Sequence, residues 1–114
     1  MKRPGMWGAL AALSGAVAVV AGAFGAHGVS GKAAEWLRTG AEYQMIHAVA
    51  ALVALNLPKG RGAAVLFVGG GVLFAGTLYA MACGGPKWLG AITPLGGAAM
   101  IGGWLVLALA ALRR

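Results

Sequence analysis

Negative charge and cysteine are nearly absent from this chain. Its 114 residues include nine lysines and arginines but only two acids, Glu35 and Glu42, and a single cysteine, Cys83. One cysteine excludes a disulfide within the chain, and we expect this thiol, at the end of an apolar run, to be a small packing residue. Charged residues make up 10% of the sequence, whereas soluble domains carry about 25%.

Hydrophobic residues make up 61% of the sequence. A chain this short and this apolar cannot bury its hydrophobic side chains in a core surrounded by water, so the lipid bilayer is the expected solvent and the first expected partner. The net charge of +7 would suit nucleic acid, but the basic residues stand at the ends of apolar runs rather than on a polar domain. We therefore expect them to contact lipid head groups, and no nucleic acid.

Four apolar stretches approach or exceed the length that crosses a hydrocarbon core, about 20 residues. Backbone polar groups in lipid must be paired within the chain, and the stretches lack the alternation of strands, so helices are expected. The sequence predicts an all-α fold, in which residues 1–114 form one bundle of four transmembrane helices with short loops. The predicted spans are 6–26, 41–57, 63–83 and 91–112, with the second helix free to begin near residue 33. Thr93 is expected to cap the fourth helix and Pro94 to open it.

Basic residues set the expected orientation. With four spans, both chain ends and the second loop share a side that carries six basic residues, and the opposite side carries three together with both acids. Because cytoplasmic loops are enriched in lysine and arginine, we predict that both termini are cytoplasmic. The six are Lys2, Arg3, Lys59, Arg61, Arg113 and Arg114, and the three are Lys32, Arg38 and Lys87.

Small residues gather on one side of the first predicted helix, and bulky aliphatic residues gather on the other. In membranes, small residues let helix backbones approach closely, so the small side should face the bundle. Single glycines in the third and fourth spans are expected to serve the same purpose. The predicted packing residues are Gly8, Ser14, Gly15, Ala18, Gly22, Gly25, Gly76, Gly96 and Gly97.

The second span begins with a polar segment that helical geometry divides. At 100° per residue, Tyr43, Gln44 and His47 fall on the small-residue side and are expected to face the bundle. The other side carries Glu35, Arg38 and Glu42 at spacings of three and four residues, which suits an ion-pair stripe at the head-group level.

Tyr43, Gln44 and His47 are not the only polar side chains expected in their half of the bilayer. Polar side chains of the other spans also favour the extracytoplasmic half, so a polar pocket there is a candidate site for a ligand, an ion or a partner. The alternative is a hydrogen-bond network that only locks the helices together. The predicted pocket consists of His27, Tyr43, Gln44, His47, Thr77, Tyr79 and Thr93.

Five segments of this sequence resemble the domain-of-unknown-function family 423, small bacterial YgdD-like membrane proteins related to animal transmembrane protein 256. They are GAFGAH (22–27), WLRTGAEYQMIH (36–47), FAGTLYAMA (74–82), TPLGG (93–97) and GGW (102–104). The resemblance covers nearly the whole chain and implies a small multi-pass protein of the bacterial cytoplasmic (inner) membrane. It implies no molecular role. The characteristic positions that it marks are Gly25, His27, Trp36, Thr39, Gly40, Glu42, Tyr43, Gln44, His47, Gly76, Tyr79, Thr93, Pro94, Gly96, Gly97 and Trp104.

No HExxH, GxSxG or P-loop motif is present, so the sequence predicts no catalytic residue, no metal and no cofactor, and gives no support to an enzyme. The leading hypothesis is a structural or accessory protein that packs with itself or with a membrane partner. Binding of a lipid or quinone head group in the polar pocket is the alternative, and transport of protons or small solutes is a weaker one. Ligand, partner and oligomeric state are left open.

Overall fold

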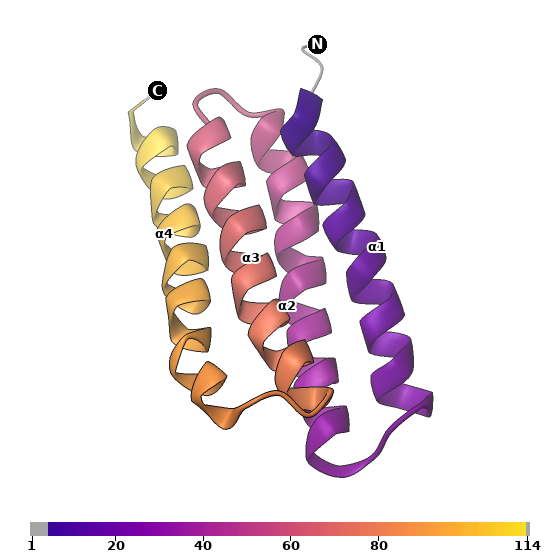
Figure 1. Ribbon diagram of the computed structural model, residues 1–114. Coiled ribbons are helices and arrows are strands. Elements are labelled where there is room, and N and C mark those ends of the chain that lie inside the picture. The colour runs from indigo at the N-terminus through magenta and orange to yellow at the C-terminus, as the bar shows by residue number, and fades with distance from the viewer. Residues whose placement is uncertain (1–4, 114) are drawn as a thin grey trace.

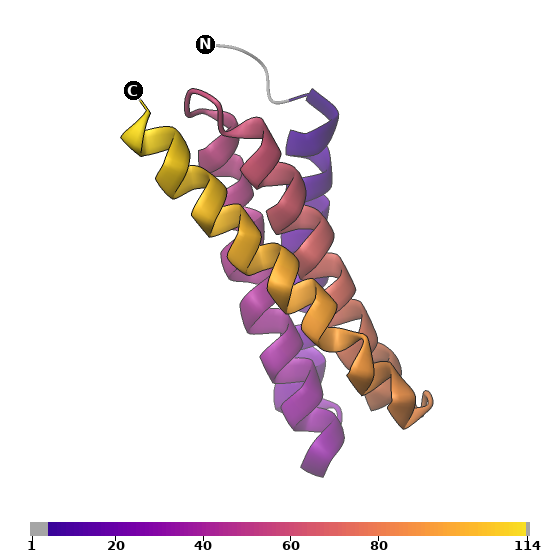
Figure 2. The ribbon, with the colours of Figure 1, turned by 90° about the vertical axis from the view of Figure 1, so that its left-hand side faces the viewer.

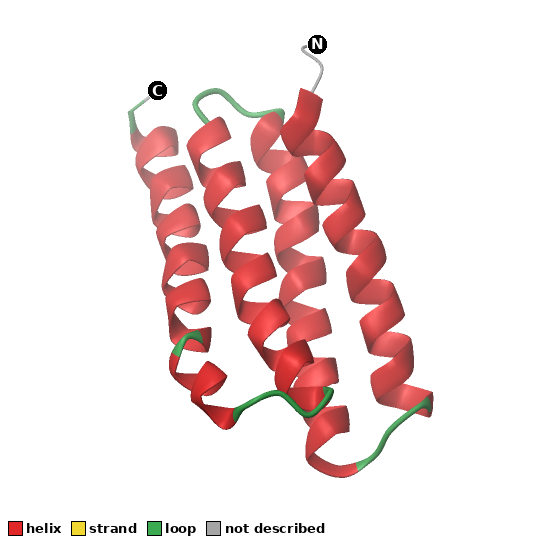
Figure 3. Ribbon diagram, in the orientation of Figure 1, coloured by secondary structure: helices red, strands yellow, loops and turns green. Residues whose placement is uncertain are grey.

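The computed structural model describes residues 5–113, and every regular element in this range is a helix (Figure 3). The predicted all-α fold is confirmed. Lys2, Arg3 and Arg114, which enter the orientation argument, lie outside the described residues. The elements are α1 (Gly5–His27), α2 (Gly31–Leu55), α3 (Arg61–Ala82), the short 3-10 helix η1 (Lys87–Ala91) and α4 (Thr93–Leu112).

The four long helices run alternately in opposite directions and stand side by side (Figure 1). α2 packs against α1 and α3, and α4 packs against α3, while α1 makes only slight contact with α3. α1 and α4 flank the α2–α3 pair on opposite sides (Figures 1 and 2). The helices therefore form an open row rather than a closed bundle.

Three helical stretches are long and apolar enough to cross a membrane: Gly5–His27, Arg61–Ala82 and Lys87–Leu112. α2 has sufficient length, but four charged residues between Lys32 and Glu42 make its first half polar. Composition thus supports three of the four predicted spans.

The start of α4 differs from the prediction. Thr93 is the first helical residue rather than the cap, because η1 leads directly into the helix through Ile92. The Thr93 hydroxyl lies 3.2 Å from the Leu89 carbonyl oxygen and 2.6 Å from the Thr77 hydroxyl. Pro94 occupies the first turn, as predicted.

Alanine and glycine, rather than large side chains, fill the contacts between helices. Phe67 is the one large side chain that is fully buried among the described residues, and its neighbours in the core are mainly alanines. α3 and α4 approach most closely at Gly70 and Gly96, where a methyl group added to either residue would overlap the opposite backbone. Small residues at such crossings let dispersion contacts between backbones hold membrane helices together.

Most of the predicted packing residues face other helices. Gly76 is the exception: it is exposed, and a Cβ atom built there would meet nothing within 4 Å. It fails as a contact residue because α1, the helix it faces, stands too far from α3. Of the others, Gly8, Ser14, Ala18, Gly25 and Gly96 are buried, and Gly15, Gly22 and Gly97 are partly buried.

Candidate functional site

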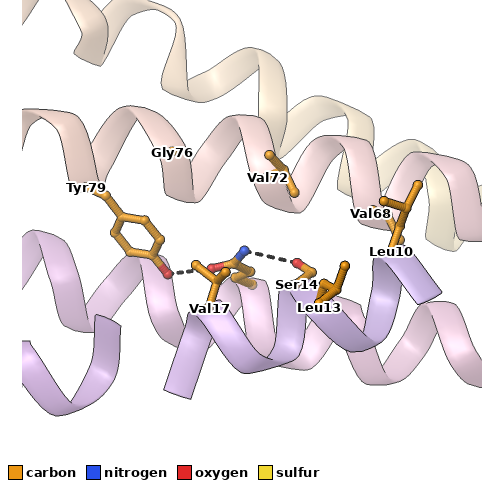
Figure 4. Close-up of a pocket in the computed structure, with 9 residues that line it drawn as sticks. Leu10, Leu13, Ser14, Val17, Val68, Val72, Gly76 and Tyr79 are labelled. Atoms are coloured by element: carbon orange, nitrogen blue, oxygen red, sulfur yellow. Dashed lines mark hydrogen bonds between the residues drawn. The ribbon is translucent and has the colours of Figure 1, made fainter. Parts of the chain in front are cut away.

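A groove runs between α1 and α3, and α2 forms its floor (Figure 4). The groove has a volume of about 300 Å³. It exists because α1 and α3 both pack on α2 but barely touch each other. Its walls are apolar: Leu10, Leu13 and Val17 on α1, and Val68, Val72 and Gly76 on α3.

The floor of the groove carries a chain of hydrogen bonds that joins three helices. The Gln44 side chain on α2 donates from Nε2 to the Ser14 hydroxyl on α1, at 3.0 Å. The Tyr79 hydroxyl on α3 donates to Gln44 Oε1, at 2.6 Å. Figure 4 shows Tyr79 and Ser14 approaching this bridge from opposite walls. Gln44 is only 4% exposed, so its amide depends on these partners.

His47 belongs to a different network. One ring nitrogen, Nδ1, lies 2.7 Å from the carbonyl oxygen of Tyr43, and the other, Nε2, accepts a hydrogen bond from the Trp104 indole at 3.0 Å. A carbonyl oxygen can only accept and an indole can only donate, so the imidazole is the neutral Nδ1–H tautomer. Both nitrogens are occupied, and the ring links α2 to α4.

Aromatic rings surround His47 on the side that faces α4. Phe67 and Trp104 pack together with ring centroids 4.7 Å apart, and Phe67 lies 5.5 Å from the imidazole. Tyr43 packs on Phe74 at 4.9 Å. Tyr43 and Trp104 are 45% and 46% exposed, so this cluster reaches the surface of the protein.

Thr77 and Thr93 form a third polar contact, between α3 and the start of α4. Their hydroxyls lie 2.6 Å apart, and the Thr77 hydroxyl also donates to the Phe74 carbonyl oxygen at 2.9 Å. With Thr77 donating to Phe74, the single hydrogen of the Thr93 hydroxyl is shared between the Thr77 oxygen and the Leu89 carbonyl oxygen, which lies 3.2 Å away. These contacts join α3, η1 and α4 and suit a structural lock.

The seven residues of the predicted pocket therefore do not share one pocket. Gln44 and Tyr79 meet at the groove, His47 and Tyr43 belong to the aromatic cluster, and the two threonines pair at the α3–α4 contact. His27 stands alone and exposed at the end of α1. Tyr43 was expected to face inward with its two neighbours, but its side chain is nearly half exposed because α4 does not cover it.

Sequence reasoning placed Ser14 on the packing face but did not pair it with Gln44, and it named Trp104 without a partner. Both contacts join residues far apart in the chain, which helical periodicity alone does not reveal. The three residues of the predicted ion-pair stripe, Glu35, Arg38 and Glu42, are all exposed on α2, and their pairing stays a prediction. Within residues 5–113, no group of three or more histidine, cysteine or acidic side chains is arranged to hold a metal ion.

Comparisons with known proteins agree on one family. A family model described as "Protein of unknown function (DUF423)" matches residues 21–97. A UPF0382 membrane protein of Haemophilus influenzae is 44% identical over 108 residues, which cover 87% of each chain. The UPF0382 membrane protein YwdK of Bacillus subtilis is 40% identical, covering 91% of this chain and 94% of its own. The UPF0382 inner membrane protein YgdD of Escherichia coli is 37% identical, covering 90% and 86%. No solved structure matches.

Proposed function

The chain belongs to the DUF423 family of membrane proteins, and we propose that it binds a lipid-soluble small molecule, a lipid or a quinone, in the groove between α1 and α3. The observation that carries this proposal is the polar chain of Ser14, Gln44 and Tyr79 on the floor of an otherwise apolar groove. Apolar walls with a few convergent polar groups are the usual construction of a small-molecule site.

A purely structural role explains this arrangement less well. If these hydrogen bonds only locked the helices together, α1 and α3 would be expected to pack against each other and cover the bonds, since a polar group that faces lipid is costly. Here α1 and α3 stay apart above Gln44, and Gly76 leaves the α3 wall open where a larger side chain would fill the space. An occupant of the groove would fill the space beside the buried Gln44 amide and restore the packing between the two walls.

The proposal includes the topology. α2 crosses the membrane together with the other three helices, and both termini are cytoplasmic in the inner membrane. Lys59 in the α2–α3 loop, Arg61 at the start of α3 and Arg113 after α4 support this. The loop and the end of α4 lie at the same end of the row (Figure 1), and basic residues favour the cytoplasm.

The single native cysteine tests the orientation. Cys83 is exposed just after α3, at the proposed extracytoplasmic end. A membrane-impermeant maleimide added to spheroplasts should label the native protein. The matched variant Cys83→Ala/Asn56→Cys, with its thiol in the α2–α3 loop, should be labelled only after the membrane is opened. The reverse pattern would invert the topology.

Substitution of glycines on α3 tests the binding function. Gly76→Leu places a side chain in the groove, whereas Gly69→Leu places the same side chain on α3 outside the lining, and a Cβ atom at either position meets nothing within 4 Å. Native mass spectrometry of protein extracted with its own lipids should show a small molecule bound to the native chain and to Gly69→Leu but absent from Gly76→Leu.

Equal occupancy in the two variants would refute binding in the groove. The same spectra report stoichiometry, so they also test the prediction that the chain packs with itself or with a membrane partner. A copurifying protein that is lost selectively from Gly76→Leu would assign the groove to a partner helix and overturn the proposed small molecule.

A further inference from the structure

The depth of the groove restricts what can occupy it. Ser14 lies nine residues after the start of α1 at Gly5 and thirteen before its end at His27. At 1.5 Å per residue, the polar floor is about 14 Å from one end of the helix and about 20 Å from the other. The hydrocarbon core of a bilayer is about 30 Å thick, so the Ser14 end of the polar chain lies in its interior, far below the level of phospholipid head groups, while Tyr79 stands three residues before the end of α3.

The polar chain has more hydrogen-bond donors than it can use. Ser14, Gln44 and Tyr79 together bring four donor hydrogens: one on each hydroxyl and two on the amide. Two of these form the internal bonds. Turning the Gln44 amide around exchanges donors and acceptors but leaves the count unchanged. Two hydrogens therefore remain, and the side-chain hydrogen bonds described for residues 5–113 include none donated by Ser14 and no second one donated by the Gln44 amide.

No residue that lines the groove carries a charge. Its lining consists of aliphatic side chains, one glycine and the three neutral members of the polar chain. A phosphate or an ammonium group at this depth would have no counter-ion and would meet the high cost of a charge in hydrocarbon. A simple acyl chain would fit the walls but would leave both donor hydrogens unpaired, which also costs free energy.

We infer that the occupant is an uncharged molecule with a long apolar tail and carbonyl oxygens, of the class of alkyl- or prenyl-substituted quinones. This inference rests on the proposed function and names the ligand class of the same groove. The ring lies over Gln44, where a carbonyl oxygen accepts the leftover hydrogens. The tail lies between the leucine and valine walls of α1 and α3.

Two ligands that differ only in their oxygens test this class. The full-length protein in nanodiscs is titrated with radiolabelled decyl-1,4-benzoquinone and, separately, with decylbenzene. The quinone should bind the native chain about eightfold more tightly than decylbenzene, because two hydrogen bonds of about 0.6 kcal/mol each in a membrane correspond to that change. Gly76→Leu should abolish binding of both ligands, and Gly69→Leu should abolish neither.

Gln44→Glu is the isosteric test of the leftover donors. An ionised carboxylate would accept from both Ser14 and Tyr79 and leave no donor hydrogen, and a protonated one would leave a single hydrogen. The quinone should therefore bind this variant about threefold to eightfold more weakly than the native chain, for the protonated and the ionised carboxyl respectively, while decylbenzene should bind as before. If circular dichroism shows that the variant does not fold, the difference in affinity between the two ligands for the native chain tests the ligand class by itself.

The outcomes separate the inference from the proposed function. Equal affinity for quinone and decylbenzene, both lost in Gly76→Leu, would overturn the carbonyl ligand and keep the groove as a site for apolar chains. If neither ligand distinguishes Gly76→Leu from Gly69→Leu, the groove binds neither, and the proposed function falls as well.

Discussion

The crossing of α3 and α4 gives the sharpest prediction about stability, because two adjacent glycines differ there in what surrounds them. A Cβ atom built at Gly96 would overlap the backbone nitrogen of Phe74 and lie 2.7 Å from the Gly70 carbonyl oxygen. At Gly97 it would meet only the Phe74 ring edge, at 3.9 Å, which is an ordinary contact. Gly96→Ala and Gly97→Ala therefore add the same methyl group to the same turn of α4 with different consequences.

Two opposing effects set the magnitude. Alanine in place of glycine within a helix stabilises by about 1 kcal/mol, because it restricts the unfolded chain and favours helical backbone. Overpacking of a closed contact costs about 1–3 kcal/mol. The obstacle at Gly96 is backbone, which cannot rotate away as a side chain can, so the upper end applies. We expect Gly96→Ala to destabilise by about 2 kcal/mol and Gly97→Ala to stabilise by about 1 kcal/mol.

Unfolding by sodium dodecyl sulfate in mixed micelles, followed by circular dichroism, measures both free energies of unfolding. The two variants have the same amino-acid composition, so a difference between their free energies of unfolding reports the local packing at each glycine. Equal stability of the two would refute the close backbone approach of α3 and α4, and with it the interpretation that glycines set the distance between these helices.

Two further predictions concern the polar side chains. Gln44→Leu leaves the hydroxyls of Ser14 and Tyr79 without their shared partner, so the same titration should show a loss of about 1 kcal/mol for two interhelical hydrogen bonds; an unchanged stability would contradict the bridge. Trp104→Phe removes one indole N–H, so nitrogen NMR should find His47 as the Nδ1–H tautomer in both proteins, with only the Nε2 resonance shifted; an Nε2–H tautomer in the native chain would contradict the assignment.

The helices and most of their inward faces could be predicted from the sequence because they follow from local patterns. Composition indicates lipid as the solvent, lipid requires paired backbone groups, and the 3.6-residue period then assigns Ser14, Gln44 and His47 to buried positions, where the structure has them. The same reasoning puts Tyr43 inside, and there it fails. A helix face is covered only if a neighbour stands over it, and α4 packs on α3 instead.

The groove could not be predicted because it depends on the order of helices in space. Gln44 meets Ser14 and Tyr79, which lie 30 and 35 residues away in the chain. A closed bundle with α1 beside α4 would pair the same helix faces differently and leave no gap between α1 and α3. The polar pocket expected from depth alone therefore divides into three separate contacts, and only the contact of Gln44 with Tyr79 lines the groove.

The position of α2 explains how a helix too polar by composition can lie among three apolar ones. Hydropathy counts each residue as if it faced lipid alone, but Gln44 and His47 are hydrogen-bonded to partners on α1, α3 and α4. The charged residues of α2 end at Glu42, and the thirteen residues from Tyr43 to Leu55 span about 20 Å. This uncharged part packs against both α1 and α3, so its burial depends on the other helices. We therefore expect α2 to insert poorly into a membrane as an isolated segment and fully within a fragment that contains α1, α2 and α3. A glycosylation-mapping assay of the isolated segment and of the three-helix fragment would measure the inserted fraction of each.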